Sequence, residues 1–311
     1  MPQLTPTRRP AVRARRGLSL IELLITMTVL AIVGASLTSI LTRQQRFYRD
    51  AAERVELRRE LRSGAALVPA DLRALSTIGG DLLAASGTAL EIRASIGSAV
   101  VCAKPNNTTL HLVPLNTTTH TLTAWYTEPR LGDAVFVFND SSGTGAEDDS
   151  WSAHTIDAAP AYPGDATRCA GSPYVAAADA ALPKMAIVVT PALSPHVGVG
   201  SVVRFTRRMR YSFYQPGGAT DWYVGYEAWN GTGYDAIAPV IGPLQATTGL
   251  GFSFADSAGT AVVPNTAAAR ARITRIGLRM QASGRSDALR ARGGVAYTDS
   301  LVFKIGVRNY K

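Results

Sequence analysis

The stretch Arg15-Arg16-Gly17-Leu18-Ser19-Leu20-Ile21-Glu22-Leu23-Leu24 opens an apolar run that ends near Leu41. Residues 18–41 carry one charged side chain, which is that of Glu22. As a helix rising about 1.5 Å per residue, this run measures about 36 Å, and the hydrocarbon core of a bilayer measures about 30 Å. An unpaired carboxylate at the bilayer centre costs about 2.5–3.5 kcal/mol, so a carboxylate kept in such a segment indicates a function. The stretch therefore predicts a membrane-spanning helix with one functional acid.

The segment before the apolar run is strongly basic. It has no acidic residue and contains five arginines, which are Arg8, Arg9, Arg13, Arg15 and Arg16. Positive charge ahead of a span favours a cytoplasmic N-terminus. Basic residues just after the span, Arg43, Arg46 and Arg49, oppose this signal. Their charge is partly offset by the nearby acids Asp50 and Glu53. Without the five leader arginines the net charge falls from +9 to +4, so the rest of the chain is only mildly basic.

Two ordinary explanations compete with a functional span. A secretory signal peptide also has a basic region and an apolar core, and Gly34-Ala35-Ser36 could serve as its cleavage site. The apolar run is, however, longer than the roughly 7–15 residues usual for such a core. A plain single-span anchor is the second alternative. Neither explanation gives Glu22 a role.

The N-terminal motif resembles the processing and methylation site of type IV prepilins and of type II secretion pseudopilins, because Gly17 is followed by Leu18-Ser19-Leu20-Ile21-Glu22-Leu23. The resemblance implies that a prepilin peptidase cuts between Gly17 and Leu18 and methylates the new amine of Leu18. A glycine before the cut lets the protease approach the backbone closely. Glu22 then lies in the first helical turn, where the helix dipole favours a carboxylate. The resemblance implies that Glu22 pairs with the Leu18 amine of a neighbouring subunit and so acts as an assembly contact.

A second helical segment follows the span. Residues 42–75 are rich in Ala, Leu, Glu and Arg, which are good helix formers. Pro69 is expected to bend or interrupt the helix. Apolar residues recur there at intervals of three or four, namely Leu57, Leu61, Ala65, Val68, Leu72 and Leu75. We expect this stripe to dock on a sheet.

From Leu90 onward the apolar period shifts toward two, which is typical of half-buried antiparallel strands. The clearest strands are predicted at 208–214, 222–229, 251–255, 275–280 and 301–307. Residues 139–150 and 157–173 are expected to be loops. The fold class is therefore α+β, with a long N-terminal helix packed on a β-rich head. We expect three parts: a basic leader over 1–17 that is removed, a spine helix over 18–75, and a globular head over 76–311.

Cys102 and Cys169 both lie in the part expected to be exported. An even pair of cysteines in an oxidising compartment predicts a disulfide, and two separate buried thiols are the alternative. By the entropy of loop closure, such a bridge would stabilise the head by about 4 kcal/mol.

Catalytic and metal-binding patterns are weak in this chain. The histidines are scattered without metal-ligand spacing, at His111, His120, His154 and His196. No nucleophile elbow, zinc-protease motif or phosphate loop occurs, so we expect neither an enzyme nor a cofactor. Four acids gather in one glycine- and serine-rich stretch, where a calcium site is conceivable but a solvated loop is favoured: Asp140, Glu147, Asp148 and Asp149. No metal site is predicted.

Aromatic and basic residues cluster in the second half of the chain. Residues 211–234 hold eight aromatic side chains, which could stack on sugars or bases. Cross-strand pairing in a hairpin turned by Pro216-Gly217-Gly218 is the favoured interpretation. Arginines also cluster here, and the favoured interpretation is that they line the solvent-exposed face of a sheet. The alternative is a stripe that contacts DNA. The residues concerned are Arg204, Arg207, Arg208, Arg210, Arg270, Arg272, Arg275 and Arg279.

The order of these segments resembles the W-type minor pilins of type IV pili and is also close to the J-type pseudopilins of type II secretion. The resemblance implies a structural subunit that helps to start pilus assembly or forms the pilus tip. Its partners would be prepilin peptidase, other minor and major pilins, and the inner-membrane assembly platform. It would span the inner membrane once with its head in the periplasm, and then enter the pilus or pseudopilus. The alternatives are a J-type pseudopilin, and a tip adhesin or DNA-binding pilin, with contact to nucleic acid less favoured.

Overall fold

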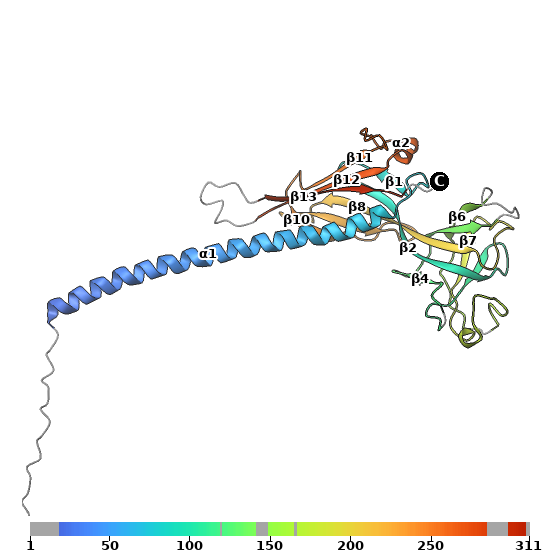
Figure 1. Cartoon of the computed structure of the whole chain (residues 1–311), viewed down its shortest axis with the longest axis horizontal. Helices are drawn as coiled ribbons and strands as arrows, with labels where there is room; N and C mark the ends of the chain where they lie inside the picture. The colour runs from blue at the N-terminus through green and yellow to red at the C-terminus, as the bar shows by residue number, and fades with distance from the viewer. Residues whose placement is uncertain (1–18, 119, 141–148, 165–166, 285–297, 309–311) are drawn as a thin grey trace, which may run out of the picture. The chain divides into compact units, whose positions relative to one another are not determined.

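The computed structural model describes residues 19–118, 120–140, 149–164, 167–284 and 298–308 (Figure 1). The side chains of Ala65 and Ser283 are not described. The chain divides between Arg54 and Val55 into two units, and each is treated by itself.

Helix α1 runs without a break from Leu20 to Arg73. The hydroxyl oxygen of Ser19 caps its start by accepting a hydrogen bond from the Glu22 amide at 3.2 Å. An interruption at Pro69 does not occur, because the helix continues through this residue to its last turn. Pro69 removes one hydrogen bond from the helix, and the burial of its ring offsets part of that cost.

In the first unit, α1 exposes apolar side chains on all sides between Leu20 and Leu41. Its most apolar 18-residue window has a mean hydropathy of 2.2, so by length and composition it can cross a membrane. Four hydroxyl groups in this segment, those of Thr26, Thr28, Ser36 and Thr38, bond back to carbonyls one turn earlier at 2.8–2.9 Å. Because these groups need no water, the segment is suited to an apolar surrounding.

In the second unit, the last part of α1 packs on an open antiparallel sheet. The strands of this sheet lie in the order β1-β2-β8-β9-β10, with bounds β1 Leu82–Ala85, β2 Ala89–Ala103, β8 Val202–Tyr214, β9 Trp222–Ala228 and β10 Ala238–Leu244. The helix approaches β10 closely, since a Cβ atom on Gly64 would lie 2.6 Å from Ile241 Cδ1. The predicted apolar stripe does dock on a sheet, because Leu57, Leu61, Val68 and Leu72 are buried.

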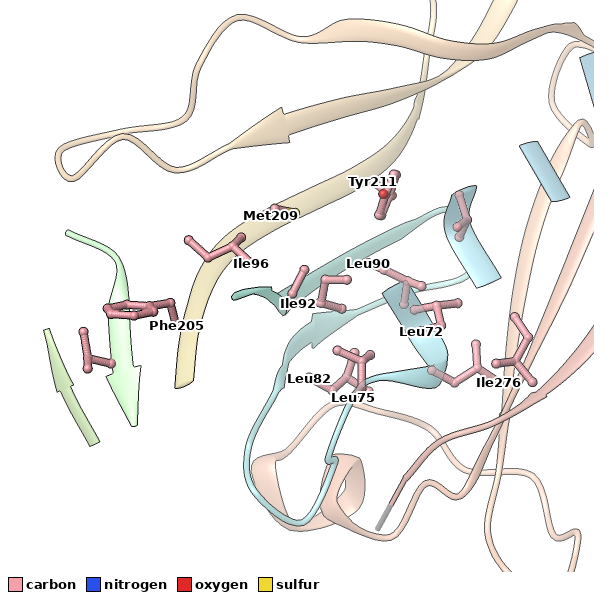
Figure 2. Close-up of a cluster of buried hydrophobic side chains, with 14 of the residues drawn as sticks. Leu72, Leu75, Leu82, Leu90, Ile92, Ile96, Phe205, Met209, Tyr211 and Ile276 are labelled. Atoms are coloured by element: carbon pink, nitrogen blue, oxygen red, sulfur yellow. The ribbon is translucent and has the colours of Figure 1, made fainter. Parts of the chain in front are cut away.

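A three-stranded antiparallel sheet completes this part of the head. It consists of β11 Leu250–Ala255, β12 Arg275–Ser283 and β13 Thr298–Gly306, and the short helix α2 Ala267–Ala271 precedes β12. Figure 2 shows the shared core, in which Leu72 of α1 lies among Leu90 and Ile92 of β2 and Ile276 of β12.

The far halves of β2 and β8 leave the open sheet and form a barrel. They pair with four shorter strands: β3 Thr109–Leu112, β5 Ala134–Asn139, β6 Ser150–Ile156 and β7 Ala186–Thr190. The pairings run β2-β3-β7-β6-β5-β8 and return to β2, so these six strands close on themselves. Closure removes free strand edges. One continuous stretch, about residues 97–206, therefore forms a barrel at the end of the β2–β8 pair (Figure 1).

The barrel encloses an apolar interior. Its fully buried side chains include Val101, Leu110, Leu112, Val135, Val137, Ile156, Ile187, Val189, Val203 and Phe205. Strand β4, Ala124–Trp125, pairs with β2 on the outside, and the 3-10 helix Ala177–Asp179 lies in the connection before β7. Gly97 admits β4, because a Cβ atom there would lie 2.5 Å from the Ala124 carbonyl oxygen.

These observations confirm an α+β fold with a long apolar N-terminal helix and an antiparallel β-rich head. The five predicted strands overlap β8, β9, β11, β12 and β13. Residues 157–164 and 167–173 form no strand, as expected for a loop, apart from one isolated bridge at Ala161. Most of the expected loop over 139–150 lies outside the described residues.

Candidate functional site

The candidate site at the N-terminus is described from Ser19 onward, so Gly17 and Leu18 lie outside the described residues. Glu22 lies in the first turn of α1, and its side chain is exposed. The Ser19 hydroxyl and carbonyl accept from the amides of Glu22 and Leu23, at 3.2 and 3.1 Å. This capping satisfies two of the first amides of the helix, which have no partner within it.

A part-buried hydrogen bond ties the end of α1 to the sheet. The Tyr211 hydroxyl on β8 donates to the Asp71 carboxylate at 2.6 Å. Burial raises the pKa of Asp71 above its ordinary value, although the hydrogen bond from Tyr211 acts in the opposite direction. Burial, together with the nearby Asp71 charge, also raises the pKa of Tyr211. The pair therefore fixes the helix to the head through a carboxylate that is costly to ionise.

A disulfide joins Cys102 and Cys169, whose Cα atoms lie 5.2 Å apart, and the predicted bridge is thus present. Cys102 lies one residue before the end of β2 and Cys169 lies in the long loop after β6, so the bridge holds that loop against the barrel. The two cysteines form a small second core with Val113. Beside them, burial and the Arg168 guanidinium lower the pKa of His111.

The predicted basic stripe on β8 is neutralised within the head. Each arginine has an acidic partner: Arg204 with Asp81 at 3.3 Å, Arg207 with Asp133 at 2.7 Å, Arg208 with Glu91 at 2.5 Å and Arg210 with Glu227 at 3.4 Å. In the second group, Arg272 pairs with Asp256, while Arg270 and Arg275 donate to backbone carbonyls. Compensated charges release few counterions from a polyanion, so β8 is poorly suited to bind phosphates.

The aromatic cluster pairs across strands. Tyr211 lies opposite Tyr226 with ring centroids 5.5 Å apart, and Phe213 stacks on Trp222 at 4.8 Å. Arg208 and Arg210 cover Tyr234, at 5.4 and 3.9 Å from its ring centroid. The favoured interpretation, a paired hairpin, is confirmed for these residues.

Two exposed aromatic residues on the outside of the barrel, Tyr126 and Trp151, were not predicted from the sequence. The side chain of Trp151 lies on the outward-facing side of β6, and its neighbours in the chain are Ser150 and Ser152. An aromatic residue flanked by serines in an alternating strand is the signal that could have identified it.

The histidines and acids form no ligand set in the part of the chain that the structure describes. No group of three or more His, Cys, Asp or Glu residues there could hold a metal ion. His154 instead bonds to the Ser152 hydroxyl at 2.7 Å and to the Pro191 carbonyl at 2.8 Å. Of the four acids considered for calcium, Glu147 and Asp148 lie outside the described residues.

Comparison with known proteins identifies the N-terminal segment. The prokaryotic N-terminal methylation motif matches residues 12–38, a range that includes Gly17, Leu18 and Glu22. Searches of curated proteins and of solved structures found no match for the chain. The motif implies processing by prepilin peptidase and assembly with other pilins. With this motif leading into an apolar helix that can span a membrane, the chain fits a type IV pilin-like protein.

Proposed function

We propose that this chain is a W-type minor subunit of a type IV pilus, which helps to start assembly or lies at the pilus tip. The motif at residues 12–38 supports a pilin-like protein or pseudopilin that is a substrate of prepilin peptidase. The role is structural, in keeping with the pilin type.

The observation that carries the minor role is the barrel. The six barrel strands, which lie between about residues 97 and 206, enlarge the head at the far end of the β2–β8 pair, beyond the sheet on which α1 packs. A subunit repeated along a dense filament needs a head that packs against its neighbours in every direction. A head enlarged in this way is better placed where neighbours are few, at an end of the filament.

The N-terminal residues would act in a fixed order in this proposal. Prepilin peptidase cuts between Gly17 and Leu18 and methylates the Leu18 amine, while α1 holds the subunit in the inner membrane. During assembly, Glu22 of the incoming subunit pairs with the Leu18 amine of a neighbour. Because the pair forms in a medium of low dielectric constant, an incorrect register leaves both charges uncompensated.

The disulfide agrees with a head exported to the periplasm, since such bridges persist in oxidising compartments. The proposed parts are a leader over 1–17, a spine over 18–75 and a head over 76–311.

The test is deletion of the gene in its host, followed by counting of surface pili and by immunogold labelling of the complemented strain. The proposal predicts few pili after deletion, and label at pilus ends rather than along the shaft. Normal piliation together with loss of protein secretion would instead identify a J-type pseudopilin.

A further inference from the structure

A groove on the outside of the barrel combines exposed aromatic rings with small polar residues. It has a volume of about 460 Å³ and is lined by Ser95, Gly97, Ser98, Ala124, Trp125, Tyr126, Trp151, Val202 and Arg204. These residues come from β2, β4, β6 and β8 and from the residue after β4, so the pairing of β2 with β8, far apart in the chain, is what brings them together. The volume lies in the range of about 300–1,000 Å³ that is usual for small-ligand sites.

The aromatic residues of the groove are held in place but left open. Trp151 is 50% exposed, and its ring packs edge-on against Phe138 with centroids 5.4 Å apart. Tyr126 is 95% exposed, while its backbone amide is fixed by a 2.8 Å bond to the Ile96 carbonyl. Within the described part of the chain, neither the Tyr126 hydroxyl nor the Trp151 indole nitrogen has a hydrogen-bond partner. Large exposed rings in a hollow mark binding sites, because leaving them in water is unfavourable.

Part of the groove lining has little side-chain bulk, and two of its residues are serines. Gly97, Ser98 and Ala124 carry small or no side chains, and Gly97 is also the residue that lets β4 lie against β2. A ring-shaped ligand could therefore approach the sheet closely and still meet hydroxyl groups at Ser95 and Ser98.

The charge of the groove is compensated. Arg204 is the one cationic residue among those that line it, and its Nη2 lies 3.3 Å from Asp81 Oδ2. Asp81 is buried, so the pair is a fixed part of the fold. A guanidinium has five N–H groups, and those turned away from Asp81 can donate to a ligand hydroxyl.

We propose that this groove binds a neutral pyranose sugar of a glycan. The flat face of a pyranose presents C–H groups with partial positive charge, which pack favourably on the negative face of an aromatic ring. The hydroxyl groups at its rim match the serines and the paired Arg204. This binding does not depend on the assembly role proposed above.

Single-stranded nucleic acid also stacks on aromatic rings, but it needs uncompensated cations along its backbone. The groove has none among its lining residues, because Arg204 is paired. The compensated charge therefore favours a neutral sugar over a nucleic acid.

The experiment is isothermal titration of the full chain in a detergent without a sugar headgroup. Maltose, cellobiose, lactose and N,N′-diacetylchitobiose are titrated to millimolar concentration, and a single-stranded oligothymidine is titrated in parallel. Trp151→Ala removes the indole ring that packs against Phe138. Tyr126→Ala removes a ring that contributes little to folding, because its side chain is almost fully exposed. Tyr162→Ala is the matched control, since Tyr162 is 41% exposed and does not line the groove.

The proposal predicts that at least one disaccharide binds. Trp151→Ala and Tyr126→Ala should each raise its Kd about tenfold or more, as loss of an aromatic anchor does, and Tyr162→Ala should leave it unchanged. Three results would overturn the proposal: no disaccharide binds, the groove variants bind as the parent does, or the oligothymidine alone binds.

Discussion

At the scale of single residues, the Asp71–Tyr211 hydrogen bond fixes the end of α1 and also makes stability depend on pH. Burial raises the pKa of Asp71 in the folded state above its ordinary value of 3.8. The folded state therefore holds this proton more tightly than the unfolded state does. The resulting stabilisation is full below pH 3.8 and is lost as the pH rises through the raised pKa.

We expect Asp71→Asn to be more stable than the parent at pH 7, because the amide still accepts the Tyr211 hydrogen bond and cannot ionise. The difference should shrink as the pH falls toward 3.8, where the parent carboxyl becomes neutral. Thermal unfolding of the two proteins across this pH range is the measurement. Tyr211→Phe is the control: it leaves the buried carboxylate without its donor and should cost about 1–3 kcal/mol at pH 7. A stability difference between Asp71→Asn and parent that does not change with pH would contradict the argument.

At the scale of elements, the sequence predicted those whose signal is local. Helix α1 follows from composition and an apolar stripe, and β12 and β13 follow from strict alternation, as in Leu301, Phe303 and Ile305. The barrel was not predicted. Strands β3 and β7 have four and five residues, too few for a clear period, and the return pairing of β8 with β2 joins residues that lie about a hundred positions apart.

The residues of the candidate site and of the groove also differ in whether a local sequence pattern reveals them. Gly17, Leu18 and Glu22 are neighbours in the chain, so their motif could be identified from the sequence alone. Tyr126 and Trp151 meet in one groove because β2, on which β4 pairs, pairs with β8, and a long-range pairing of this kind leaves no local pattern to find.

The disulfide is expected to stabilise one element in particular, the long loop after β6. Cys102 and Cys169 are 67 positions apart, for which loop closure gives about 4 kcal/mol. Replacing both with serine should increase proteolysis in the loop over 157–173 and leave α1 in the membrane fraction. Limited proteolysis with identification of the cut sites measures this effect. Two alkylated cysteines per chain in denatured, unreduced parent protein would show that no bridge forms in the cell.

At the scale of the whole molecule, an N-terminal segment suited to a membrane and a filament belongs to the same chain as a head that carries an additional barrel. Membrane insertion depends on the apolar run, while incorporation into a filament is proposed to depend on Glu22. The two steps should therefore be separable by mutation.

Glu22→Ala should leave the amount of protein in the membrane normal and reduce its share in sheared filaments, because a neighbouring Leu18 amine loses its partner. Glu56→Ala is the matched control, since it removes an exposed carboxylate from the same helix beyond the apolar run. Immunoblots of membrane and filament fractions give the ratio. Equal incorporation of Glu22→Ala and parent would show that this carboxylate is not an assembly contact.

The central claim, that the chain is processed as a prepilin, is tested most directly by mass spectrometry of the N-terminus of protein from the membrane or from sheared filaments. The account predicts a mature chain that begins at Leu18 with an N-methylated amine. It also predicts that Gly17→Val leaves the leader attached, because the added side chain obstructs the protease. A mature N-terminus near Ser36, or a parent chain that keeps its leader, would contradict the account.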